Sequence, residues 1–168
     1  MISIPWKVEL SKSRWQTIVI FSLAFWLSGS LILDLVIMPS LYVSGMINSS
    51  GFAIAGNLIF SAFNRVELLC AALGMTGILV LSSSPTDSGK GSRIAILLSF
   101  ILLAIALICT YTLTPQMTAL GVDLNLFESV TEVPSEMNLL HGSYFGLEAI
   151  KLAVGATLIG WCYRHQAV

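Results

Sequence analysis

Four apolar stretches, each long enough to cross a lipid bilayer, constrain this chain more than any other feature, and three of them contain ionisable residues. A helix needs about 20 apolar residues to span the hydrocarbon core. The stretches are Thr17–Met38, Phe52–Leu81, Ile94–Leu113 and His141–Tyr163. Only 10% of the residues are charged and the mean hydropathy is +0.88, whereas a soluble domain has about 25% charged residues. The sequence therefore predicts one transmembrane domain over residues 1–168, an all-α bundle of four helices.

Basic residues outside the spans all fall on one side of this layout. They flank the chain ends and the middle loop: Lys7, Lys12, Arg14, Lys90, Arg93 and Arg164. Because segments rich in Lys and Arg stay in the cytoplasm, both termini are predicted to be cytoplasmic. The net charge of −1 gives no reason to expect a nucleic-acid partner. The bilayer, most simply the plasma membrane, is the expected partner.

Two prolines are predicted to end the first and third spans. Pro39 and Pro115 follow the apolar stretches directly, and proline disfavours helical geometry in the residue before it. Beyond Pro115, the outer loop repeats Leu120, Leu124 and Phe127 at helical spacing, while Asp123, Asn125 and Glu128 occupy the other side. This pattern predicts a short amphipathic helix lying at the outer interface.

The ionisable residues within the spans indicate a functional site. A charge in hydrocarbon costs several kcal/mol, so such residues normally face a protein interior. Glu148 and Lys151 are three residues apart on one helix and can neutralise each other. Asp34 is expected to pair with Arg65 on a neighbouring helix. Measured from the outer helix ends, all the charges fall in the outer half of the membrane.

We therefore predict a polar pocket in the outer half that binds a small cation or another polar ligand. Its predicted residues are the five charges and three polar neighbours on the same helices: Asp34, Asn64, Arg65, Glu67, His141, Tyr144, Glu148 and Lys151. Three acids against two bases leave one net negative charge, which favours a cation or a proton. The alternative is that the charges form ion pairs that only fix the helix register.

Methionines near the outer helix ends suggest a second, metal-binding interpretation. The candidate ligands are His141, Met38, Met46, Met117 and Met137. Thioether and imidazole groups suit Cu(I), although methionine is also a common packing residue. A haem held by two histidines is disfavoured, because His141 and His165 are about 36 Å apart along one helix. The sequence assigns no cofactor.

The motifs of common enzyme classes are absent from the sequence. It contains no nucleophile elbow, P-loop, dinucleotide fingerprint or zinc-ligand spacing. Cys70, Cys109 and Cys162 have no paired spacing and are predicted to be buried packing residues. A non-enzymatic role is favoured. The alternatives are an auxiliary or assembly subunit of a larger respiratory or photosynthetic membrane complex, and a haem- or copper-linked membrane oxidoreductase.

A short internal repeat relates the two halves of the chain. Phe63-x-x-Val66-Glu67 in the second span matches Tyr144-x-x-Leu147-Glu148 in the fourth, and the first and third spans both end in an X-Pro pair. If this match is not chance, Glu67 and Glu148 are equivalent residues facing a common centre.

These motifs also resemble a known family. The pattern Asp34-x-x-x-Met38-Pro39, with Phe63-Asn64-Arg65-x-Glu67 and Leu140-His141-x-x-Tyr144-x-x-x-Glu148, resembles small four-span bacterial membrane proteins of unknown function, with cyanobacterial members. That family is loosely similar to copper-resistance D-type proteins and to HemJ-type protoporphyrinogen oxidases. The HemJ-type histidine of the first span has no counterpart here, so the resemblance implies no catalytic role. It implies the thylakoid as a second membrane for a cyanobacterial chain.

Overall fold

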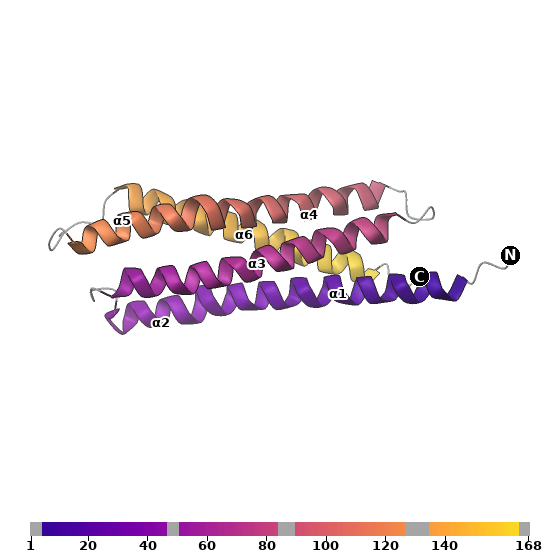
Figure 1. The fold of residues 1–168 in the computed structure, drawn as a ribbon, viewed down its shortest axis with the longest axis horizontal. Coiled ribbons are helices and arrows are strands. Elements are labelled where there is room, and N and C mark those ends of the chain that lie inside the picture. The colour runs from indigo at the N-terminus through magenta and orange to yellow at the C-terminus, as the bar shows by residue number, and fades with distance from the viewer. Residues whose placement is uncertain (1–4, 47–50, 84–89, 127–134, 165–168) are drawn as a thin grey trace.

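The computed structural model describes residues 5–46, 51–83, 90–126 and 135–164, and its regular elements are all helices (Figure 1). Two of them, labelled η, are π-helical turns. The elements are α1 Pro5–Ile32, η1 Leu33–Ile37, α2 Met38–Val43, α3 Phe52–Ser82, α4 Lys90–Ile108, η4 Cys109–Leu113, α5 Thr114–Leu126 and α6 Ser135–Arg164.

Four continuous helical segments are long and apolar enough to cross a membrane: Lys12–Val43, Ile54–Ser82, Lys90–Gly121 and Ser135–Arg164. Large hydrophobic side chains remain exposed on their outer faces, among them Phe21, Leu35 and Leu58. Such exposure suits a lipid environment, because the acyl chains cover surface that water would disfavour. These are the properties of a multi-pass integral membrane protein, and the predicted all-α bundle of four transmembrane-length helices is confirmed.

The four long helices form an up-and-down bundle in which sequence neighbours run antiparallel (Figure 1). Helix α1 packs against α3 and α6, and α4 packs against the same two helices. Helices α3 and α6 therefore stand diagonally opposite across the bundle axis. Small residues let α1 approach both partners. A Cβ added at Gly77 of α3 would overlap Val19, and one added at Gly155 of α6 would lie 2.8 Å from Leu27.

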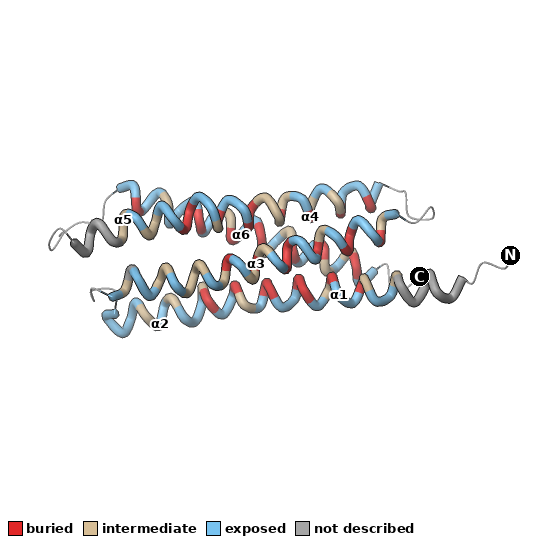
Figure 2. The backbone as a smooth tube through the Cα atoms, viewed as in Figure 1, coloured by how far each residue is buried: buried red, intermediate tan, exposed pale blue. Residues whose placement is uncertain are grey.

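The main apolar core fills the half of the bundle nearer the chain termini (Figure 2). It includes Val19, Leu23, Ile78, Leu102 and Leu158. A smaller apolar cluster around Ile105, Cys109, Leu113 and Tyr144 lies further along. All three cysteines are free and buried, as predicted.

The two prolines do not end their helices. Five π-helical residues and one further residue precede each proline. In a π-helical turn the backbone N–H bonds to the carbonyl five residues back instead of four, so the turn is wider. The N–H of Met38 donates to Leu33 O, and that of Thr114 donates to Cys109 O, both five residues back. Proline has no N–H and clashes with the carbonyl four residues earlier, and the wider turn accommodates that carbonyl without breaking the helix. Both helices therefore continue past the prolines that were expected to end them.

The π-helical turns have two consequences for the predicted layout. First, α5 continues from α4 and packs against α3, so the residues after Pro115 extend the third long helix. Part of the predicted interfacial helix, residues 127–134, lies outside the described residues. Second, the segment η1-Met38-Pro39 matches η4-Thr114-Pro115 position for position. This match adds a structural correspondence to the sequence repeat.

Candidate functional site

Lys151 of α6 is the centre of a buried ionic cluster. Its side chain is 1% exposed, and its Nζ pairs with Glu67 Oε1 across the bundle axis and with Glu148 Oε2 at 2.5 Å on its own helix. Glu67 is 2% exposed and Glu148 is 5% exposed. The ammonium also lies 5.6 Å from the centre of the Trp26 ring, within range of a cation–π interaction. The cluster thus connects the diagonal helices α3 and α6.

Helix α1 supplies the next groups of the cluster. The indole Nε1 of Trp26 donates a 2.7 Å hydrogen bond to Glu67 Oε1, and the Ser30 hydroxyl donates to the same oxygen at 3.3 Å. Trp26, Ser30 and Asp34 are spaced four residues apart, so they lie along one face of the helix. This face turns toward α3 and α6 and carries Asp34 into the cluster on the π-helical turn η1.

Asp34 and Glu148 bring two carboxyl groups together. Asp34 is half-buried and close enough to Glu148 for the two side chains to interact electrostatically. Glu148 Oε1 is buried with no hydrogen-bond partner in the described part of the chain. Two carboxyl groups can share a hydrogen bond only when one of them holds a proton. The geometry therefore offers a binding position for a proton between α6 and η1.

The charge balance of this cluster differs from the predicted one. Arg65 is exposed on α3, and no ion pair joins it to Asp34 among the described residues. The expected Asp34–Arg65 pair was wrong, because Arg65 is two residues from Glu67 and the helix turns them to opposite sides. Three carboxyl groups, those of Asp34, Glu67 and Glu148, therefore face one buried ammonium.

Two further predicted residues lie beside the cluster. Asn64 is 1% exposed, sits one turn from Glu67, and donates a 2.8 Å hydrogen bond from Nδ2 to Thr114 Oγ1. Tyr144 is buried one turn from Glu148, and its ring packs edge-on against Phe60 at 5.7 Å. Both residues border the cluster on the side toward α2 and α5.

The predicted copper ligands are distributed differently. His141 is exposed, and its Nδ1 lies 2.9 Å from the carbonyl oxygen of Met137, within the same helix. Met117 packs against the smaller apolar cluster, and Met137 is buried. Met38 begins α2, and Met46 is exposed beyond its end. In the residues that the structure describes, no group of three or more His, Cys, Asp or Glu side chains is arranged to hold a metal ion. The copper site remains a prediction.

Sequence reasoning missed three contributors to this site, Trp26, Ser30 and Thr114. Trp26 and Ser30 could have been found from the four-residue steps that lead to Asp34. Thr114 had no comparable signal, because its position depends on the π-helical turn before it.

No family model, no curated protein and no solved structure matches this chain. The resemblance to four-span bacterial proteins therefore remains a prediction. The fold and the site together define the class of this protein. It is an all-α bundle of transmembrane-length helices in which a carboxyl–ammonium cluster links three helices.

Proposed function

We propose that this protein is a proton-binding integral membrane protein, with the proton held between Asp34 and Glu148. The observation that carries the proposal is Glu148 Oε1, which is buried without a hydrogen-bond partner and has the Asp34 carboxyl as an acidic neighbour. The small cation that the sequence predicts is, in this proposal, a proton.

The charge count of the buried cluster supports this proposal. If all three carboxyl groups were ionised, the single ammonium of Lys151 would leave two negative charges uncompensated in a membrane interior. An uncompensated charge there costs several kcal/mol, so uptake of a proton is favourable. A metal ion between Glu67 and Glu148 is disfavoured, because Lys151 Nζ already pairs with both carboxyl groups.

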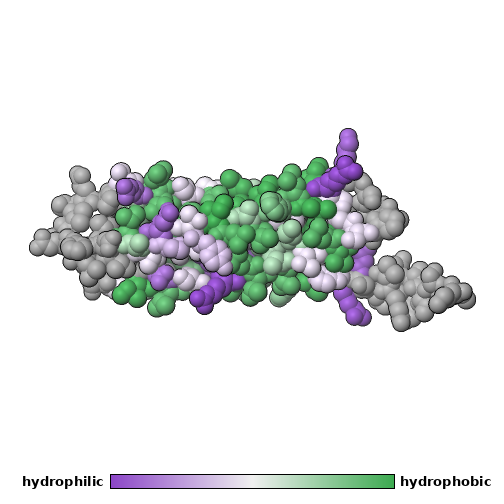
Figure 3. Space-filling view, turned by 45° about the horizontal axis from the view of Figure 1, so that its top comes forward, coloured by the Kyte–Doolittle hydropathy of each residue, from purple (hydrophilic) through white to green (hydrophobic). Residues whose placement is uncertain are grey.

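The positions of the basic residues support a location in the outer half of the bilayer. The helices are longer than the hydrocarbon core is thick, so part of each helix extends beyond the core. Counting about 20 residues, or about 30 Å, from Arg14 on α1 leads to Asp34, and the same count back from Arg164 on α6 leads to Tyr144. Glu148 then lies one turn inside the outer boundary. Figure 3 shows a hydrophobic band over the part of the bundle nearer the termini and more polar residues toward the other end.

In this orientation both termini are cytoplasmic, as the basic residues predict. Helix α2, much of α5 and the first turns of α3 and α6 then project from the outer surface. The amphipathic residues after Pro115 lie at or beyond the interface on an extension of α4.

Infrared spectroscopy of the purified protein in detergent tests the proposal directly. A protonated carboxyl group absorbs separately from a carboxylate, so the wild type should show this band at neutral pH. Asp34→Asn and Glu148→Gln should each abolish the band. Glu136→Gln, which changes an exposed acid on the same helix, serves as the control and should leave it unchanged. A wild-type spectrum without the band at neutral pH would refute the proposal.

One observation favours a second function, as a subunit of a larger membrane complex. Arg65 is exposed between the lipid-facing residues Ala62 and Leu69 of α3, where an acidic residue of a partner would neutralise it. Native gel electrophoresis after mild detergent extraction tests this alternative. A complex that forms with the wild type and dissociates with Arg65→Gln would support it, whereas migration as a lone small particle would exclude it.

A further inference from the structure

A line of neutral polar side chains runs from the ionic cluster toward the end of the bundle formed by α2 and α5. Asn64 donates to Thr114 Oγ1 at 2.8 Å, and Thr118 Oγ1 lies 2.8 Å from the carbonyl oxygen of Thr114. The Thr118 hydroxyl is also 3.1 Å from Asn57 Oδ1, which accepts a further 3.0 Å hydrogen bond from Ser61. We call these five residues the polar lane.

The polar lane occupies one face of each of two packed helices. Asn57, Ser61 and Asn64 follow one another on α3 in steps of four and three residues, and the next step of three reaches Glu67. Thr114 and Thr118 are one turn apart on α5, which packs against α3. Helices α2 and α5 lie at the same end of the bundle (Figure 1), and the lane leads from that end to Asn64, one turn from Glu67.

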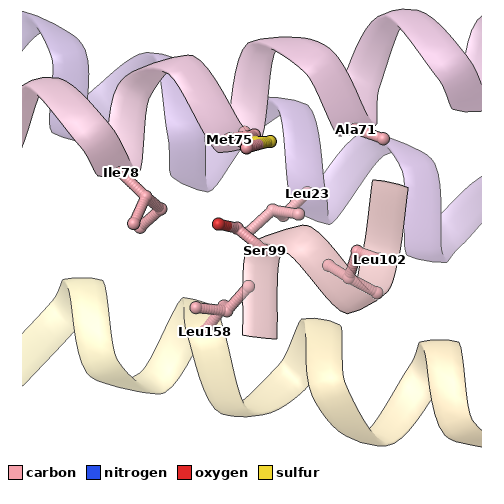
Figure 4. A pocket seen from close by; sticks show the side chains of 8 residues that line it. Leu23, Ala71, Met75, Ile78, Ser99, Leu102 and Leu158 are labelled. Atoms are coloured by element: carbon pink, nitrogen blue, oxygen red, sulfur yellow. The ribbon is translucent and has the colours of Figure 1, made fainter. Parts of the chain in front are cut away.

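The opposite half of the bundle also has buried polar side chains, among them Gln16, Ser22 and Ser99, but each of these three bonds a backbone carbonyl, and no hydrogen bond joins one side chain to another there among the described residues. A gap beyond the cluster is lined by Leu23, Ala71, Ile78, Leu102 and Leu158, and it has no room for a water molecule (Figure 4). Ser99 also borders this gap, but its hydroxyl donates to the carbonyl of Ile96 on its own helix. Apolar packing of this kind gives a hydrated proton no hydrogen-bond partners, so it opposes proton movement.

We propose that protons reach the carboxyl cluster from the α2 and α5 end alone, through the polar lane, and that the apolar core blocks exchange with the other end. This inference rests on the proposed function. It makes the protein a one-sided proton-binding site rather than a proton channel. Hydroxyl and amide groups of the lane can hydrogen-bond transient water molecules, which lowers the cost of moving a proton between them.

The titratable groups near the Asp34 and Glu148 carboxyls come from several elements. They are Glu67 of α3, Cys109 of η4, and Tyr144 and Lys151 of α6. None of these groups belongs to the lane. A change within the lane should therefore alter the rate of proton exchange rather than the equilibrium that these groups set.

Trp26 provides a probe, because its indole donates to Glu67 and lies against Lys151. In a variant whose other three tryptophans are replaced by phenylalanine, a pH jump in a stopped-flow instrument should change the Trp26 fluorescence as the cluster takes up a proton. Thr114→Val and Thr118→Val remove one hydroxyl each and keep the side-chain shape. Either should slow this change roughly tenfold, about the effect of one lost hydrogen bond, with the same titration midpoint.

Ser99→Ala removes a buried hydroxyl from the apolar half and should leave the rate unchanged. Equal rates in both threonine variants and the single-tryptophan parent would overturn the polar lane while leaving the proposed function intact. A parent protein with no pH-dependent signal, together with no infrared carboxyl band, would overturn the proposed function itself.

The block toward the other end is tested in vesicles that contain the protein and a pH-sensitive dye. With a membrane potential imposed, they should take up protons no faster than protein-free vesicles. A protein-dependent proton flux would show that the apolar core does not seal the bundle, and it would overturn the one-sided site.

Discussion

Replacing Lys151 with methionine should destabilise the protein more than any other single change in the ionic cluster. Methionine keeps an unbranched side chain but removes the cation that, within the described part of the chain, alone pairs with carboxyl groups of the cluster. Because Lys151 is 1% exposed, water cannot replace it. Removing one partner of a buried ion pair costs about 3–5 kcal/mol. We expect a loss of that size in the free energy of unfolding, measured by titrating the protein in mixed micelles with a denaturing detergent.

The sign of the pH dependence follows from the same charges. At lower pH the orphaned carboxyl groups take up protons, so the loss caused by Lys151→Met should shrink as the pH falls. The double variant Glu67→Gln, Lys151→Met should recover part of the stability, because glutamine still offers an oxygen to Trp26 and Ser30. Arg65→Met removes an exposed cation from the same region and should change stability by no more than about 0.5 kcal/mol. A loss below about 1 kcal/mol, or a double variant no more stable than the single one, would refute the reasoning.

Three further predictions concern packing, the π-helical turn and orientation. Gly77→Ala should lower the free energy of unfolding by about 1–3 kcal/mol, because the new Cβ would overlap Val19. The control Gly146→Ala meets open space and should not destabilise the protein. Thermal unfolding compares the two variants. Pro39→Ala should let η1 return to α-helical geometry and rotate Asp34 away from Glu148, which would remove the infrared carboxyl band while the far-UV helix signal stays. Asn138→Cys should react in intact cells with a membrane-impermeant thiol reagent and Ser83→Cys should not, and the reverse pattern would contradict the proposed orientation.

The sequence was sufficient to predict the long helices and much of the cluster, because both follow from residue type and helical spacing. Glu148 and Lys151 are three residues apart, so their pairing needs only an α-helix between them. The diagonal contact of Lys151 with Glu67 depends on the order of helices around the axis, which spacing does not give. Asp34 was paired with the wrong residue because its direction changes at η1.

The π-helical turns themselves were beyond the reach of sequence reasoning. Proline in a helix can either end it or distort it, and the surrounding packing decides between the two. Here α2 and α5 continue from η1 and η4, and α5 packs along α3. The Thr114 hydroxyl reaches Asn64 only because the chain continues in this way.

The matching π-helical turns allow the helices of the two halves to be aligned pair by pair, and this alignment shows where their residues differ. With η1 placed on η4, Asp34 corresponds to Thr110, and with Glu67 placed on Glu148, Lys151 corresponds to Cys70. The acid at position 34 and the base at position 151 each occur in one half only. The two glutamates therefore lie in unlike surroundings, which gives the centre of the bundle a front and a back.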